Sequence, residues 1–335
     1  MKINIQMPQT LDSSNIVSID DMKNYYDSAT EFIKPIALRA FRDSDELSFS
    51  KIQHILYHYN TNDMERIVDP TSLRGVAERA VRNFIFSIQE DYYVPYLKEI
   101  NGQFSIEKAI NVLKEEALSH RINSHPLFKV MDAGLSKDEI RIFLDNYYVN
   151  NRLFHLHLAT LSLTTPLVKR NDLFANLYDE LGCDDVDNAH PTLFLKNYDF
   201  IGLSDSIEPS SGTLHLLNTK IGLTHLSSDF RKGFGGLGFI EISMPVQMKS
   251  ILKGLTNSGM STSQTTFWDL HISIDERHGE SWFHEMRELI NSVDDYKIIL
   301  DSGIRLLNAR ASLYDDIYTA INLLRQNSTN NVVVS

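Results

Sequence analysis

Helical periodicity dominates this 335-residue chain and narrows its fold more than any other feature. From about residue 21 to residue 326, apolar residues recur every three or four positions, the spacing of an amphipathic helix. Runs that alternate apolar and polar residues, as strands do, are almost absent, and 15 glycines and 9 prolines are few for an all-β protein. The sequence therefore predicts an all-α helical bundle.

The expected helices fall into two groups. Helical patterns cover residues 21–60 and 70–100, separated by the turn-like stretch NTNDMERIVDPTS. After a break at Asn101-Gly102, helices are expected at about 105–120, 136–163, 170–183, 190–202, 213–227, 236–256, 262–292 and 294–326. We predict an N-terminal helical extension at residues 1–104 and a bundle at residues 105–330.

The composition excludes several classes of partner and site. The net charge of −12 leaves no basic surplus to neutralise phosphates, which argues against a nucleic-acid partner and an anionic membrane surface. No apolar run approaches the roughly 18 residues of a spanning helix, and the N-terminus lacks the apolar core of a secretory signal, so we expect a cytoplasmic protein with no membrane partner. The single cysteine, Cys183, excludes an internal disulfide and a multi-cysteine metal site. A metal would have to be held by His, Asp and Glu.

The stretch HISIDERH places three groups that bind protons or metals on one expected helix. His271, Asp275 and His278 stand at positions i, i+4 and i+7, which share one helical face with Phe267 and Ile274. The stripe should point inward, where an unpartnered carboxylate and two unpartnered imidazoles are costly. A metal ion would compensate, because it accepts imidazole nitrogens and carboxylate oxygens together. The alternative is a hydrogen-bonded His–Asp–His ladder or a partly wet helix face.

Further candidate groups lie upstream. In NLYDELGCDDVDNAHPTLF, Glu180 ends one expected helix in an apolar register and His190 begins the next. In GFGGLGFIEISMPVQMKSIL, Glu241 is the lone charge in an apolar stretch, which is unusual for a carboxylate. Pro245 removes the N–H that would bond the carbonyl of Glu241, so we expect a kink or a loosened turn there. The alternatives are a surface role for Glu180 and a single tolerated Glu241 in an interface helix.

Three carboxylates and three imidazoles thus come from three separate helical regions. This ligand set suits a di-iron or di-manganese site in a helical bundle. The usual bundle signature is a pair of Glu-x-x-His motifs, of which this chain has none; Asp275-x-x-His278 is its nearest variant.

The combined pattern resembles the haem-oxygenase-like di-metal (non-haem di-iron) oxidases and oxygenases, also described as iron-containing redox enzymes. The resemblance spans roughly residues 110–290 and rests on E-x9-H, the isolated Glu and H-x3-D-x2-H, with the softer phrases SHPLF, FLDNYY and FWDLHISIDERHGESW. It implies a seven-helix up-and-down core like that of haem oxygenase, without haem. It also implies two Fe(II) ions per chain, with O₂ as co-substrate. The implied metal ligands are Glu180, His190, Glu241, His271, Asp275 and His278. Three carboxylates and two Fe(II) would nearly balance in charge.

One departure from the family pattern reduces the number of reaction types that the resemblance implies. Members that hydroxylate nitrogen resemble this pattern but add a Glu on the preceding helix, where this chain reads NNRLFHLHLAT with Phe154 or a neighbour at the matching place. N-oxygenation is therefore in doubt, which leaves desaturation, oxidative C–C cleavage or decarboxylation. The substrate would be a small molecule such as an amino acid, a fatty acid or a biosynthetic intermediate, and an external electron donor is compatible with this chemistry. His157 stays open as an additional ligand.

Two other function classes fit the same bundle. In a cofactor-independent or thiaminase-type enzyme, or in a small-molecule binder, the His and Glu residues would be acid–base or hydrogen-bonding groups. A non-catalytic protein could instead use its acidic surface to bind a carrier protein or an enzyme. The N-terminal helical region could support a homodimer. Metal content separates the first of these alternatives from the di-iron hypothesis.

Overall fold

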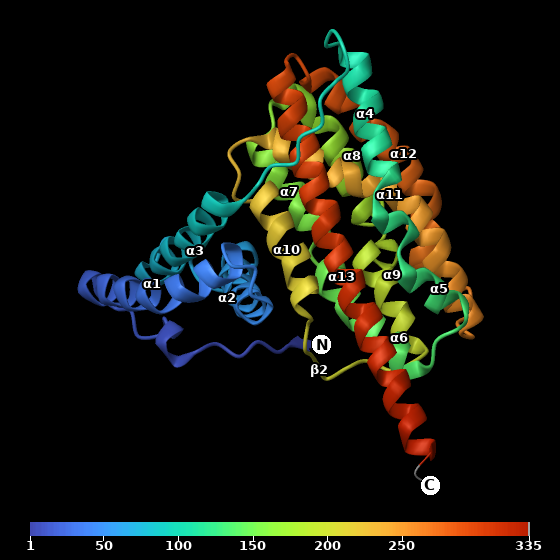
Figure 1. The fold of residues 1–335 in the computed structure, drawn as a ribbon, viewed down its shortest axis with the longest axis horizontal. Coiled ribbons are helices and arrows are strands. Elements are labelled where there is room, and N and C mark those ends of the chain that lie inside the picture. The colour runs from blue at the N-terminus through green and yellow to red at the C-terminus, as the bar shows by residue number, and fades with distance from the viewer. Residues whose placement is uncertain (334–335) are drawn as a thin grey trace. The chain divides into compact units, whose positions relative to one another are not determined.

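The computed structural model describes residues 1–333, with side chains described as far as Ser328. Within these residues helices account for nearly all regular structure, and the strands are one pair of two residues each. The prediction of an all-α fold is confirmed (Figure 1). No described helix is both long enough and apolar enough to cross a membrane.

The chain forms two compact units. One comprises Asn4–Pro95, and the other combines Met1–Ile3 with Tyr96–Ser335. The division predicted from the sequence lies at residue 104. In the structure the helical pattern expected up to residue 100 ends at Tyr92, and residues 93–105 lie outside helices. Pro95 lies in this stretch and lacks the backbone N–H that a helix would use.

The N-terminal unit has its own core between three helices. They are α1 (Ile19–Phe41), α2 (Glu46–Met64) and α3 (Leu73–Tyr92), preceded by a 3₁₀ helix at Gln9–Leu11. The periodic stretch 21–60 is therefore two helices, separated by a turn in which Ser44 has a positive φ of 55°. Asp45 then caps α2, since its side chain accepts a hydrogen bond from the backbone of Ser48.

The second unit is the predicted bundle. Its helices are α4 (Ile106–Ser119), α5 (Pro126–Asp132), α6 (Lys137–Asn151), α7 (Phe154–Thr164), α8 (Arg170–Glu180), α9 (His190–Leu195), α10 (Ser211–Thr224), α11 (Phe230–Asn257), α12 (Thr266–Leu289) and α13 (Val293–Val333). Short 3₁₀ helices lie at Arg121–Ser124, Leu167–Lys169, Val186–Asn188 and Lys196–Asp199. β1 (Lys2–Ile3) pairs in parallel with β2 (Ser206–Ile207).

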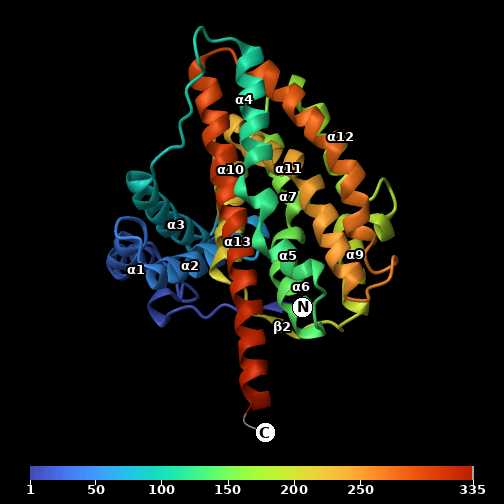
Figure 2. The same cartoon turned by 45° about the vertical axis from the view of Figure 1, so that its right-hand side comes forward.

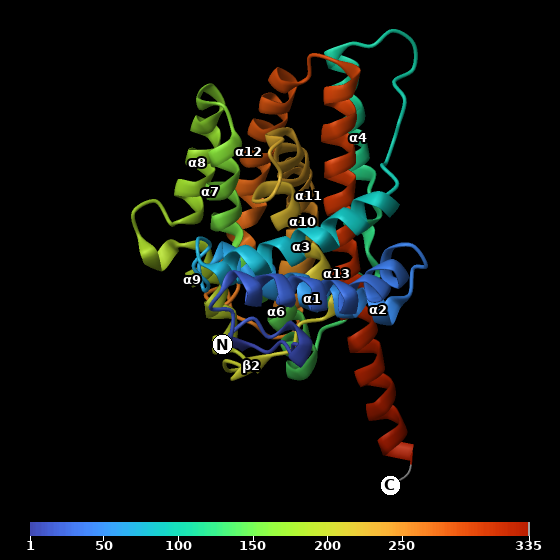
Figure 3. The same cartoon turned by 90° about the vertical axis from the view of Figure 1, so that its left-hand side faces the viewer.

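α11 lies at the centre of this bundle. It packs against α12 on one side and against α13 on another, and α10 also packs on α13 (Figure 2). α8 lies beside α7, as Figure 3 shows. One large apolar core joins these helices, so side chains that point inward from α8, α11 and α12 can meet.

The single helix expected at 136–163 is two helices. Arg152 and Leu153 form a turn between α6 and α7. No glycine or proline marks this break. The Leu153 side chain is buried at the turn, so tertiary packing overrides a helical pattern that continues across it.

α11 and α12 approach each other closely beside Glu241. A Cβ added to Gly279 of α12 would lie 3.0 Å from the Cα of Ile242 and 3.2 Å from its backbone nitrogen. A side chain at residue 279 would require the backbone of Ile242 to move by a few tenths of an ångström. α11 also continues through Pro245, whose missing N–H leaves the carbonyl of Glu241 without its usual helical donor.

Candidate metal centre

The six predicted ligands lie in two groups of three within the bundle. The first group is Glu180, His190 and His271; the second is Glu241, Asp275 and His278. In each group one ligand atom from each residue lies within 4.8 Å of those of the other two. All six side chains are buried, so the prediction that the HISIDERH stripe points inward is confirmed.

Local sequence positions the two residues that lie outside α11 and α12. Glu180 is the last residue of α8, and Gly182, two residues further on, has a φ of +86°. A Cβ at Gly182 would lie 2.2 Å from the carbonyl oxygen of Asp185, so the turn requires glycine. Residues 183–189 then bring the chain back to His190, the first residue of α9, where Pro191 favours the start of a helix.

Hydrogen bonding fixes the orientation of His271 in the first group. Its Nδ1 lies 2.6 Å from the carbonyl oxygen of Phe267. A carbonyl can only accept, so Nδ1 carries the hydrogen and Nε2 keeps a free lone pair. Burial, followed by the nearby His190, lowers the pKa of His271 to about 3. The imidazole is therefore neutral at neutral pH, which is the form that binds metals.

His190 completes the first group without a hydrogen bond of its own. Its Nδ1 lies 2.9 Å from Oε2 of Glu180, but the angles do not suit a hydrogen bond, and both ring nitrogens are buried and unpartnered. Its ring centroid lies 4.4 Å from that of His271. Buried imidazole nitrogens are seldom left without a partner. The convergence of two imidazoles and a carboxylate therefore suits a shared cation.

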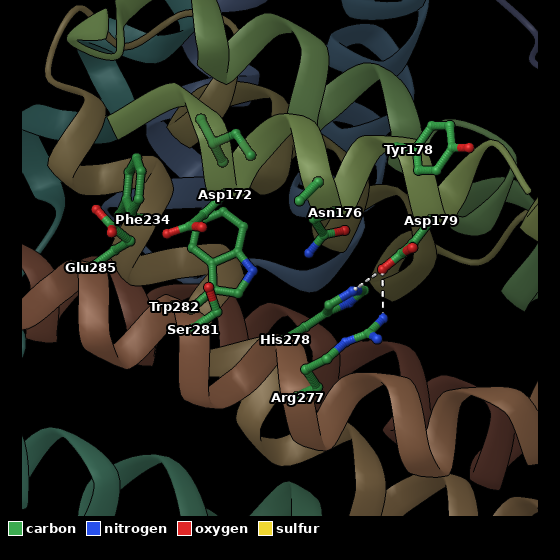
Figure 4. A pocket seen from close by; sticks show the side chains of 12 residues that line it. Asp172, Asn176, Tyr178, Asp179, Phe234, Arg277, His278, Ser281, Trp282 and Glu285 are labelled. Atoms are coloured by element: carbon green, nitrogen blue, oxygen red, sulfur yellow. Dashed lines mark hydrogen bonds and ion pairs between the residues drawn. The ribbon is translucent and has the colours of Figure 1, made fainter. Parts of the chain in front are cut away.

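The second group is held together by His278. Its Nε2 lies 2.9 Å from Oδ2 of Asp179 (Figure 4), and its Nδ1 lies 3.6 Å from Oε2 of Glu241. Although burial opposes the charged form, the carboxylates of Glu241 and Asp179 raise the pKa of His278 to about 9. Burial and then the charges of Glu241 and Glu180 raise the pKa of Asp275 well above its usual value. These protons occupy the place that a cation would take.

The residues fit a pair of divalent metal ions. Among the described residues no hydrogen bond joins His271, Asp275 and His278, so the hydrogen-bonded ladder, which was the alternative, is not formed. Oδ2 of Asp275 and Nδ1 of His278 are buried without a hydrogen-bond partner. The first group supplies two imidazoles and one carboxylate, the donor set of many non-haem Fe(II) oxygenases. The second supplies two carboxylates and one imidazole. Three donors per ion leave coordination positions open.

Asp179, which the sequence pattern does not single out, contacts the second group. Its carboxylate accepts hydrogen bonds from Nε2 of His278 and from Arg277, as the dashed lines in Figure 4 show. A histidine that binds a metal through one nitrogen commonly donates its other N–H to a carboxylate, which fixes the ring. Asp179 directly precedes Glu180, but in the sequence it looks like an ordinary surface acid at the end of a helix.

Two residues of α7, Phe154 and His157, were candidates for a position near the metal ligands. Phe154 lines the cavity of the metal ligands and offers no oxygen there. His157 is fully buried, but its Nδ1 contacts Oγ1 of Thr224 at 3.1 Å and it joins neither group of candidate ligands. The structure therefore does not bring His157 to the site.

A larger cavity of about 320 Å³ lies between α8, α11 and α12 and borders His278 (Figure 4). Asn176, Phe234, Trp282 and Glu285 are among its lining residues. Both polar atoms of the buried Asn176 side chain are unpartnered. The volume lies at the lower end of the range of small-molecule sites. The cavity can admit a small organic molecule beside the second group.

The role of Asp179 as a positioning residue can be tested. We expect Asp179→Ala to weaken metal binding at the second group by about 10–100-fold, since partners of this kind contribute that much to affinity. Asp179→Asn, whose amide oxygen can still accept the Nε2 hydrogen, should recover part of the loss. Titration with Co(II), followed by visible absorption, measures both. Asp187→Asn, in the exposed loop, is the control; equal affinities for D179A and D187N would exclude the role.

The chain is similar to a family of redox enzymes. Residues 141–302, which include all six candidate ligands, match the family model described as iron-containing redox enzyme. A 4-chloro-allylglycine synthase from Streptantibioticus cattleyicolor is 24% identical over 196 residues, which are 56% of this chain and 74% of that protein.

Solved structures have the same fold. A CADD-like protein of unknown function from Nostoc punctiforme superposes with a TM-score of 0.54 at 13% identity, covering 64% of this chain and 98% of its own. A domain of unknown function with a heme oxygenase-like fold from Shewanella denitrificans gives a TM-score of 0.49 at 17% identity, covering 66% of this chain and 93% of its own. The bundle thus shares the helical fold of the CADD-like protein, and residues 141–302 are similar to the iron-containing redox enzymes.

Proposed function

We propose that this protein is an O₂-activating non-haem di-iron oxidase or oxygenase that oxidises a small organic substrate. The observation that carries the proposal is the pair of buried three-donor groups, which share α12. Both ring nitrogens of His190, Oδ2 of Asp275 and Nδ1 of His278 are buried in them without a hydrogen-bond partner. Glu180, His190 and His271 would hold one Fe(II), and Glu241, Asp275 and His278 the other. When bound, the irons would supply the electrons that reduce O₂ and the oxidising power for the substrate.

The chain's own residues prepare the site. The Phe267 carbonyl holds the hydrogen of His271 on Nδ1, and Asp179 holds one hydrogen of His278 on Nε2. A lone pair of His271 therefore faces its group, and His278 would present one from Nδ1 once a metal ion displaces the proton there. The aromatic residues Phe194, Phe267 and Trp268 pack against one another beside His190 and His271 and exclude water from the first group.

Desaturation, oxidative C–C cleavage or a related oxidation is the reaction class we propose. Phe154 lines the metal cavity, where an additional Glu would be expected for nitrogen hydroxylation. The name of the similar synthase denotes an unsaturated amino acid as its product, which supports an oxidation that forms a C=C bond. We propose a small molecule such as an amino acid, a fatty acid or a biosynthetic intermediate as the substrate, with an external electron donor as a further partner.

Iron analysis combined with O₂ uptake tests the proposal. The purified chain, loaded with Fe(II) without oxygen and then desalted, should retain about two irons per chain. On exposure to air it should consume O₂ faster with a substrate from an amino-acid and fatty-acid panel than without. Metal-free protein is the control. Full turnover by a chelated, metal-free chain, unchanged by Glu180→Ala, would instead favour a cofactor-independent enzyme.

A further inference from the structure

The cavity of the candidate ligands has a positively charged side that the metal ions do not need. Lys220 on α10 and Arg310 on α13 line it together with Glu180 and Glu241. The two cationic residues are only 2% and 3% exposed. Lysine and arginine are almost never buried to this extent unless they are paired.

Lys220 is buried without an ion pair to any side chain that the structure describes. Within the described residues its Nζ makes no hydrogen bond or ion pair, and its recorded contact is with the Phe154 ring, 5.5 Å from the centroid. Burial, and then the charge of Arg310, lowers the pKa of Lys220 to about 7 even though Glu180 and Glu241 act in the opposite direction. An amine buried in this way is costly unless a ligand satisfies it.

Arg310 is held in place by neutral groups. Its Nε donates to Oε1 of Gln247 at 2.8 Å, and its Nη2 donates to the hydroxyls of Tyr314, at 3.1 Å, and Tyr147. None of these partners carries a negative charge, so the charge of Arg310 is not neutralised by them. Asn151 lines the same cavity, and its buried Nδ2 has no hydrogen-bond acceptor. The cavity thus presents three donors of hydrogen bonds that lack an anion.

The net charge of the site with both metal ions bound would also be positive. The three carboxylates of the candidate ligands supply three negative charges, and two divalent ions would supply four positive ones. Arg310 adds one more and Lys220 a further one when it is protonated, which leaves an excess of two to three positive charges in a buried place. The near balance expected from the sequence did not include these two residues. An excess of this size favours an anionic ligand.

We propose that Lys220, Arg310 and Asn151 bind the carboxylate of the substrate beside the metal ions. This inference rests on the proposed function and specifies its substrate as a carboxylate anion. The free space at this point is about 30 Å³. A water molecule needs about 10–15 Å³ by the same measure, so the free space suits a small anionic group and not a bulky one. The remainder of the substrate would extend away from this end of the cavity.

Acetate and its neutral isostere acetamide are the probes that test the proposal. The full chain, loaded with Co(II) to measured occupancy, is titrated with each while visible absorption is recorded. Acetate should bind at least tenfold more tightly than acetamide. Lys220→Met should weaken acetate binding by about tenfold or more at unchanged Co(II) content, and Lys220→Arg should retain most of it. Lys249→Met, which removes an exposed lysine of α11, should change nothing.

The melting temperatures of the variants provide an independent measurement. Replacing an unpaired buried amine by Met should leave the melting temperature of the loaded chain unchanged or raise it, whereas loss of a structural lysine would lower it. Asn151→Ala, expected to weaken acetate several-fold, serves if K220M does not fold. Acetate affinity that is the same in wild type, K220M and N151A overturns this inference alone. A chain that binds no Co(II) overturns the proposed function as well.

Discussion

Glu241→Gln is expected to lower the iron content from two ions to one per chain and to reduce turnover by about 10³-fold. Gln has the same shape as Glu, so the packing between α11 and α12 should persist, but the second group loses one of its two carboxylates. A metal ion contributes several kcal/mol of charge stabilisation in reactions of this kind, and about 4 kcal/mol corresponds to that factor. Iron analysis of anaerobically loaded protein and O₂ uptake measure the two effects.

Glu276→Gln is the matched control for this variant. Glu276 follows Asp275 directly on α12, but its side chain is exposed and pairs with Lys249 on the surface. Its replacement should leave both iron content and turnover unchanged. Glu180→Gln should empty the first group instead, so the two ligand variants should differ in which ion they lose. Two irons and wild-type turnover in E241Q would rule out Glu241 as a ligand.

Removal of the metal should destabilise the bundle strongly. At a free metal concentration of 100 times Kd, each site adds about 2.7 kcal/mol to the free energy of unfolding. For a domain of 150–250 residues, each kcal/mol shifts the melting temperature by about 2–4 °C. Two sites therefore predict a loss of about 10–20 °C on chelation. Both tryptophans of the chain, Trp268 and Trp282, lie buried on α12, so intrinsic fluorescence follows this unit specifically.

The difference in melting temperature between metal-loaded and chelated protein should grow as the pH rises from about 6.5 to 9. In the metal-free fold the pKa of His278 is raised from 6.5 to about 9, so its contribution to stability is complete below pH 6.5 and is lost as the pH rises towards 9. Asp275, with a raised pKa, acts in the same direction from the unfolded value of 3.8 upward. His271, with a pKa of about 3, loses its contribution only below pH 6.5. In the loaded protein the metal has already displaced these protons.

Melting curves of loaded and chelated protein at pH 6.5, 7.5 and 8.5 measure this dependence. The gap between the two melting temperatures should widen at each step, because the chelated form loses stability while the loaded form does not. The chelated form of the His278→Gln variant provides the control, since it lacks the group with the raised pKa and its melting temperature should fall less as the pH rises. A gap that narrows with rising pH would contradict the assignment of these residues as ligands.

Periodicity alone predicted the most informative part of the site. The spacing i, i+4, i+7 placed His271, Asp275 and His278 on one face of a helix, and that face is buried in the structure. Glu241 stood out because it is a lone charge in an apolar stretch. In each case the signal is local, since neighbouring residues in the sequence determine which face of a helix is apolar.

Features that depend on packing were not predictable in this way. The turn at Arg152 and Leu153 contains neither glycine nor proline, so nothing local ends α6. Nor could the sequence show that His271 joins Glu180 and His190, while its neighbours on α12 join Glu241. Lys220, by contrast, has a local signal. It is the lone charge of the stretch 211–228, just as Glu241 is the lone charge of its own apolar stretch, and such a charge indicates a buried polar site.

The loop between Glu180 and His190 has a consequence for how the two groups would fill. Glu180 and His190 lie on either side of residues 181–189, so an ion held by both would tether the loop at its two ends. Once Glu180 has bound an ion, the short tether presents His190 at a high effective concentration. The second group, by contrast, is built on two long helices that are in place beforehand. Binding of the first ion would therefore hold the ends of α8 and α9 together, and its loss would release them. The second ion would bind between helices whose positions do not depend on it.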